Sequence, residues 1–83
     1  MQPTSRLEIP RTARKLQALI ADLRWRVQLL GSDIQEEEKR TGISNVSDSA
    51  YPILARNLRT RRDNLLATIT MLESRLADTG MAA

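Results

Sequence analysis

The sequence lacks several residue types on which much of protein chemistry depends. Its 83 residues include no cysteine, no histidine and no phenylalanine. Without cysteine, neither a disulfide nor a thiolate zinc site can staple a small domain. Without histidine, the commonest general base and the commonest metal ligand are missing too. These absences exclude thiol nucleophiles, serine–histidine dyads and most transition-metal sites, and we expect no cofactor and no enzymatic activity.

Long apolar runs are also missing. The longest stretch of consecutive apolar residues is Ala18 to Ala21, far short of the roughly 20 residues that cross a bilayer. The N-terminal segment MQPTSRLEIPRTARKL has no apolar core of the kind that secretory signals contain. We therefore expect a cytoplasmic protein without a membrane partner.

Charge is abundant and nearly balanced. Thirteen lysine and arginine residues stand against ten acidic residues, which gives a formal net charge of +3 at pH 7. All the basic residues except Lys15 and Lys39 are arginines. A net charge of this size is ordinary for a soluble small domain, and it permits nucleic-acid binding without requiring it.

Apolar residues recur every three or four positions in the first half of the sequence, which predicts a long helix with a coiled-coil seam. Pro10 suits the first turn of a helix and Gly42 is a typical C-terminal stop, so we expect a helix at about residues 10–41. Its seam consists of Ala13, Leu16, Ile20, Leu23, Val27, Leu30 and Ile34.

The second half repeats the pattern after a segment rich in serine, asparagine and aspartate, which favour turns. We expect a turn at about residues 42–48 and a helix at about residues 49–79. Asp48 or Ser49 would be its N-cap, and Gly80 would end it. Its seam consists of Ala55, Leu58, Arg62, Leu65, Ile69, Leu72 and Leu76, in which Arg62 is the only charged residue.

Two helices of similar length joined by a short turn predict an all-α fold, an antiparallel two-helix hairpin of coiled-coil type. Residues 10–79 would form this single domain, between a flexible N-terminal segment at residues 1–9 and a C-terminal tail at residues 80–83. A single apolar seam makes a thin core, because the entropy lost on ordering the chain is large for so short a domain.

Three large apolar residues of the first helix, Leu19, Trp25 and Leu29, lie outside its seam. They either widen the seam or contact another chain. Because soluble monomers seldom expose a large apolar patch, we predict a homodimer in which two hairpins form a four-helix bundle. Another protein is a second possible partner for the same patch.

A hairpin would bring the acidic end of the first helix beside the arginines that begin the second. The heptad register pairs Arg61 with Asp33 and Arg59 with Glu38, and it places Arg62 level with Gly31. In one interpretation these six residues form a polar layer that fixes the helix register at some cost in stability. Gly31 would then make room for the stem of Arg62, or mark a bend. The other interpretation is a site for an acidic ligand.

The sequence therefore supports two hypotheses about function. The first is a non-enzymatic protein-interaction or oligomerisation module that acts as a dimer of hairpins. The alternative is an RNA- or DNA-binding dimer that uses the surface arginines Arg24, Arg26 and Arg56. Interleaved acidic residues and the lack of aromatic side chains for base stacking argue against the alternative.

Overall fold

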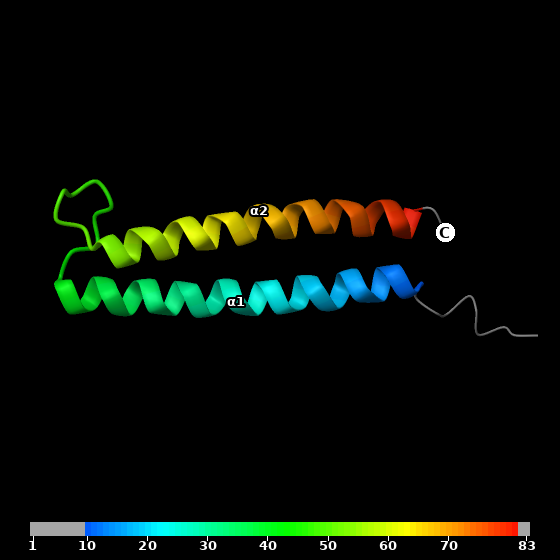
Figure 1. Cartoon of the computed structure of the whole chain (residues 1–83), viewed down its shortest axis with the longest axis horizontal. Helices are drawn as coiled ribbons and strands as arrows, with labels where there is room; N and C mark the ends of the chain where they lie inside the picture. The colour runs from blue at the N-terminus through cyan, green and yellow to red at the C-terminus, as the bar shows by residue number, and fades with distance from the viewer. Residues whose placement is uncertain (1–9, 82–83) are drawn as a thin grey trace, which may run out of the picture.

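The chain folds into two antiparallel helices joined by a loop at one end of an elongated molecule (Figure 1). The computed structural model describes residues 10–81, in which α1 spans Arg11–Thr41 and α2 spans Ile53–Met81. The principal extents of 64 × 18 × 12 Å are those of a rod. The predicted all-α antiparallel hairpin is confirmed, whereas its dimerisation stays a prediction.

The first helix begins and ends close to the positions that the sequence indicates. The Pro10 carbonyl accepts the first helical hydrogen bond, from Arg14 N at 2.9 Å. At the other end Gly42 adopts a left-handed conformation with φ of 76°, and its N–H donates to the Glu38 carbonyl at 2.8 Å. Lys39 and Arg40 lie in the last turn, where positive charge favours the helix dipole.

The second helix begins at Ile53, so the predicted start at residue 49 with Asp48 or Ser49 as N-cap is wrong. Asp48 instead organises a turn, because its Oδ1 accepts from Ala50 N at 2.8 Å and its carbonyl accepts from Tyr51 N at 3.0 Å. Pro52 disfavours a helical conformation for the residue before it. The helix therefore starts after Pro52, whose carbonyl accepts from Arg56 N at 3.0 Å.

The second helix also runs past its predicted end. It continues through Gly80 to Met81. Gly80 and Met81, which were expected in the C-terminal tail at residues 80–83, therefore belong to α2. Residues 82–83 and the expected flexible segment at residues 1–9 lie outside the described residues. Neither described helix combines the length and apolarity needed to cross a membrane, and the cytoplasmic location stays a prediction.

The core is a single line of side chains along the predicted seam. Buried Ile20 and Leu23 of α1 pack with buried Ile69 and Leu72 of α2. Partly buried seam residues extend this cluster, namely Leu16, Val27, Leu65 and Leu76. Because nothing in the described residues covers the seam from above or below, each helix keeps most of its circumference in solvent.

Gly31 does not have the role that the sequence suggested. A Cβ atom added there would meet no atom within 4 Å, so the glycine makes no room for the Arg62 stem. Two cross-helix ion pairs, Arg24–Glu73 and Glu38–Arg59, fix the register. Counting seven residues from either pair places Leu66, and not Arg62, level with Gly31.

The two glycines allow a matched test of this backbone description. We expect Gly31→Ala to raise the free energy of unfolding by about 0.5–1 kcal/mol, because alanine loses less entropy in a helix. The same change at Gly42 should lower it by about 1 kcal/mol, since φ is positive there. Urea unfolding followed by circular dichroism at one protein concentration measures both. Destabilisation by Gly31→Ala would show that α1 bends or has a close neighbour at this point.

Candidate functional site

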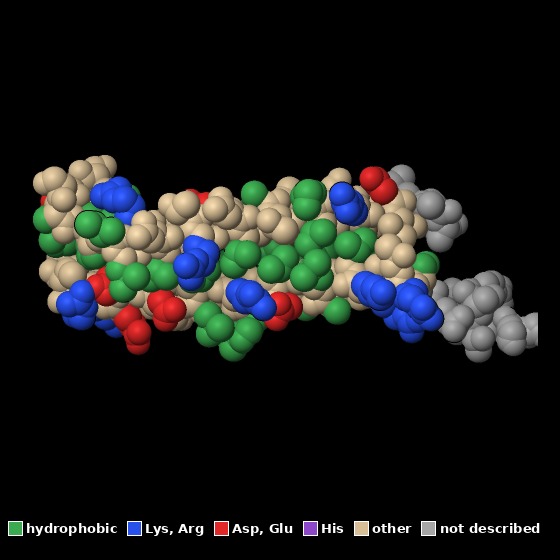
Figure 2. Space-filling model, viewed as in Figure 1, with side chains coloured by type: hydrophobic (Ala, Val, Ile, Leu, Met, Phe, Trp, Pro, Cys, Tyr) green, Lys and Arg blue, Asp and Glu red, His purple; other side chains and the backbone are tan. Residues whose placement is uncertain are grey.

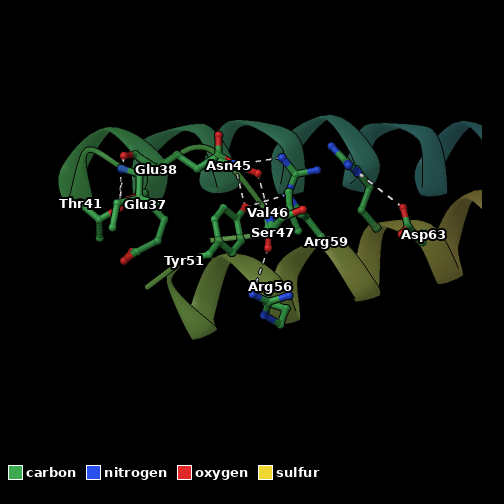
Figure 3. Close-up of polar contacts among 12 residues, drawn as sticks. Glu37, Glu38, Thr41, Asn45, Val46, Ser47, Tyr51, Arg56, Arg59 and Asp63 are labelled. Carbon is green, nitrogen blue, oxygen red and sulfur yellow. Dashed lines mark hydrogen bonds and ion pairs between the residues drawn. The ribbon is translucent and has the colours of Figure 1, made fainter. Parts of the chain in front are cut away.

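Three polar side chains join the loop to both helices near the closed end of the hairpin (Figure 3). The Tyr51 hydroxyl donates to Glu38 Oε2 at 2.6 Å. Arg59 donates from Nε to the Tyr51 hydroxyl at 2.7 Å and from Nη2 to Glu38 Oε2 at 2.9 Å. We call Glu38, Tyr51 and Arg59 the loop cluster. Its three hydrogen bonds form a closed triangle between the end of α1, the loop and the start of α2.

Arg56 holds the loop from the other side. Its Nη2 donates to the Val46 carbonyl at 3.2 Å, and its guanidinium carbon lies 5.4 Å from the centre of the Tyr51 ring. The guanidinium carbon of Arg59 lies 5.7 Å from the same centre. Both distances are typical of cation–π contacts. The buried Tyr51 ring therefore fixes the path of the loop through one acidic and two basic neighbours.

The loop cluster shifts the ionisation of its own members. The hydrogen bond from Tyr51, followed by that from Arg59, lowers the pKa of Glu38 below its ordinary value, and the positive charges of Arg59 and Arg62 add to this effect. Hydrogen bonds to Tyr51 and Glu38 raise the pKa of Arg59. Both side chains are therefore charged at neutral pH.

The structure brings together one of the two predicted ion pairs. Glu38 and Arg59 are in contact as the heptad register indicates, but Asp33 and Arg61 form no ion pair among the described residues. Counting two residues along both helices from the Glu38–Arg59 pair places Arg61 level with Glu36. The offset from Asp33 explains why the predicted Asp33–Arg61 pair is wrong. Arg61 instead lies beside Leu29 at the rim of a shallow hollow.

Arg62 occupies the seam without a partner across it. Its Nε is buried and has no hydrogen-bond acceptor, and its nearest carboxylate is that of its own neighbour Asp63, at 4.0 Å. Among the described residues the Arg62 guanidinium therefore forms no ion pair with a carboxylate of α1. Leaving a buried donor unsatisfied costs roughly 1–3 kcal/mol, so Arg62 weakens the seam at this level.

Two residues of this region were missed by the sequence analysis. Glu37 is buried and accepts hydrogen bonds from Arg40, one of them from Nε at 3.4 Å. It follows Ile34 by three positions and so occupies the next seam position. It was overlooked because the seam was traced by apolar residues alone. Tyr51 was missed because it lies outside both heptads. As the only tyrosine of the chain, next to Pro52 and close to four arginines, it could have been singled out.

The apolar residues predicted to contact another chain are all exposed. Leu19, Trp25 and Leu29 keep 45%, 59% and 46% of their surface accessible, so they do not widen the seam. Figure 2 shows hydrophobic side chains along the line between the helices and others projecting from the outer side of α1. Leu66 of α2 is 44% exposed. These side chains are free to meet another surface.

The three arginines of the nucleic-acid hypothesis each have a partner within the chain. Arg24 forms an ion pair with Glu73 across the helices, and Arg26 donates from Nε to Asp22 Oδ2 at 3.0 Å. Arg56 donates to the Val46 carbonyl of the loop, as described above. The described residues also contain no group of acidic side chains that could hold a metal ion.

Comparison with known proteins gives no further constraint, because no family profile, no curated protein and no solved structure matches this chain.

The lowered pKa of Glu38 predicts how acid destabilises the hairpin. The folded protein keeps Glu38 ionised at a pH where the unfolded chain, with a pKa of about 4.3, takes up a proton. The stabilisation is thus complete above this pH and is lost as the pH falls through the lower pKa of the folded state. We expect Glu38→Gln to be less stable than wild type at pH 7 and to lose less stability between about pH 5 and pH 3.

Urea unfolding at a series of pH values measures this difference, and Glu36→Gln is the matched control. Glu36 is exposed and forms no ion pair among the described residues, so its variant should follow the wild-type curve. Parallel curves for wild type and Glu38→Gln would show that folding does not lower the pKa of Glu38.

Proposed function

We propose that this protein is a non-enzymatic interaction module that works as a homodimer of helical hairpins. The observation that supports this function best is the exposure of Leu19, Trp25 and Leu29, the three large apolar side chains of α1 outside its seam. Tryptophan is enriched among the residues that dominate binding energy at protein interfaces. A chain of this size gains most from covering such side chains with a second copy of itself.

The thinness of the core also supports dimerisation. The buried hydrophobic residues lie in one line between two helices, and Arg62 interrupts that line with an unsatisfied donor. A two-fold dimer would add a second apolar layer perpendicular to the first and complete a four-helix bundle. Other proteins would compete for the same face.

Binding to RNA or DNA is less well supported. Arg24, Arg26 and Arg56 would have to leave Glu73, Asp22 and the loop before they could contact phosphate. Binding that weakens steeply with added salt, and that is lost in Arg24→Gln with Arg26→Gln, would favour this alternative over the interaction module.

We expect Trp25→Ala and Leu29→Ala to weaken dimerisation, with a loss of about 2 kcal/mol for the tryptophan, or roughly a 30-fold higher dissociation constant. Sedimentation equilibrium over a range of concentrations measures it. Leu66→Ala is the matched control, because Leu66 is as exposed as Leu29 but lies on α2. A wild-type chain that stays monomeric at micromolar concentration would contradict the proposed function.

A further inference from the structure

A second stripe of side chains runs along α1 beside the seam. It has the same spacing of three and four, and at about 100° per residue it faces roughly a quarter turn away from α2. All its members are exposed. The stripe consists of Lys15, Leu19, Asp22, Arg26, Leu29 and Asp33. A helix packed on this stripe would lie at the position that a four-helix bundle requires.

The order of charged and apolar residues along this second stripe is self-complementary. From Lys15 to Asp33 it reads positive, apolar, negative, positive, apolar, negative. Read backwards, every positive position meets a negative one and both leucines meet leucines. We propose that two copies pair through their second stripes, with the α1 helices antiparallel. The two-fold axis crosses the interface at the level of residue 24. The inference rests on the proposed homodimer and specifies its interface and register.

This register makes three kinds of contact, each of which occurs twice. Asp22 faces Arg26 of the second copy, and Lys15 faces Asp33 of the second copy. Leu19 faces Leu29 of the second copy, where a shallow hollow of about 280 Å³ is lined by Arg26, Leu29, Leu30, Arg61 and Leu65. A leucine entering an apolar hollow on the facing helix is the usual packing of antiparallel bundles.

The central charges are already arranged for such a contact. Within one chain Arg26 uses its Nε to bind Asp22 at 3.0 Å, and no other hydrogen bond of Arg26 is formed among the described residues. Its two terminal amino groups therefore remain free for Asp22 of the second copy. The four side chains would alternate in sign around the axis. Such exposed pairs add little affinity, but they select orientation and register.

Other arrangements of the same stripe bring like charges together. In a parallel pair each residue faces its own copy, which sets Asp22 against Asp22 and Arg26 against Arg26. Sliding the antiparallel pair by one heptad sets either Lys15 against Arg26 or Asp22 against Asp33. The proposed register also overlaps the helices along nearly their whole length, since α1 runs from Arg11 to Thr41.

Trp25 lies next to the proposed axis, on the outer flank of the second stripe. Its 59% exposed ring would meet the ring of the second copy, because the two residues are nearly level in this register. A central aromatic pair covered by charged neighbours is a common arrangement at the most strongly bound part of an interface. The loops would then lie at opposite ends of the dimer.

Charge reversal tests this proposal. In Asp22→Arg both central positions are positive, and in Arg26→Asp both are negative. We expect each variant alone to self-associate at least about tenfold more weakly than wild type. An equimolar mixture should form a heterodimer, because every central contact then joins opposite charges. Sedimentation velocity of each variant alone and of the mixture distinguishes monomer from dimer, and circular dichroism shows that each chain stays helical.

Cysteine pairing tests the register, since the chain has no cysteine of its own. Leu19→Cys mixed with Leu29→Cys should give a disulfide-linked heterodimer on oxidation. Either variant alone should not, because identical positions are ten residues apart, roughly 15 Å along the helix, which is too far for a disulfide. Self-linking of Leu19→Cys would indicate a parallel pair and overturn the proposal.

The outcomes separate this inference from the proposed function. If wild type dimerises and both charge variants also dimerise alone, the second stripe is not the interface, although the homodimer stands. If wild type is monomeric, the homodimer and this interface both fail. Heterodimer formation only on mixing, together with the Leu19–Leu29 disulfide, supports both.

Discussion

The register between α1 and α2 determines where every other side chain of this hairpin lies. Two ion pairs show it at separate levels, Arg24–Glu73 near the middle of α1 and Glu38–Arg59 near the loop. Both pairs obey the same offset, so the apolar seam between them closes without a slip. A one-residue shift would turn seam residues toward solvent, since neighbouring positions of a helix differ by about 100°. This one alignment therefore decides which residues of each helix face solvent.

Much of this arrangement could be predicted from the spacing of apolar residues. The three-and-four rhythm of α1 located the buried side of the helix, and the hairpin geometry brought Glu38 to Arg59. The predictions that failed concern side-chain positions that heptad spacing does not determine. Arg61 misses Asp33 by less than one turn, and Arg62 finds no acceptor. The role of Tyr51 was beyond reach because helical periodicity says nothing about the path of a loop. The start of α2 was misplaced because a good N-cap residue competed with the backbone restriction imposed by Pro52.

The polar and apolar candidates divide between two tasks. The loop cluster, with Arg56, uses two arginines internally to hold the closed end of the hairpin. The apolar side chains of α1 have no such internal use. We therefore place the proposed interaction surface on the outer side of α1, where apolar and charged residues alternate, and not at the arginine-rich start of α2.

The loop cluster has a consequence for the order in which the hairpin assembles. Its three hydrogen bonds join residues 8, 13 and 21 positions apart, whereas the Arg24–Glu73 pair joins residues 49 apart. Closing a shorter segment costs less chain entropy, so we expect contacts near the loop to form before the seam closes toward the termini. Unfolding reverses this order, with the open end separating first and amide protection greatest beside the loop. A second copy packed along the whole of α1 would extend that protection to the end that the loop cannot reach.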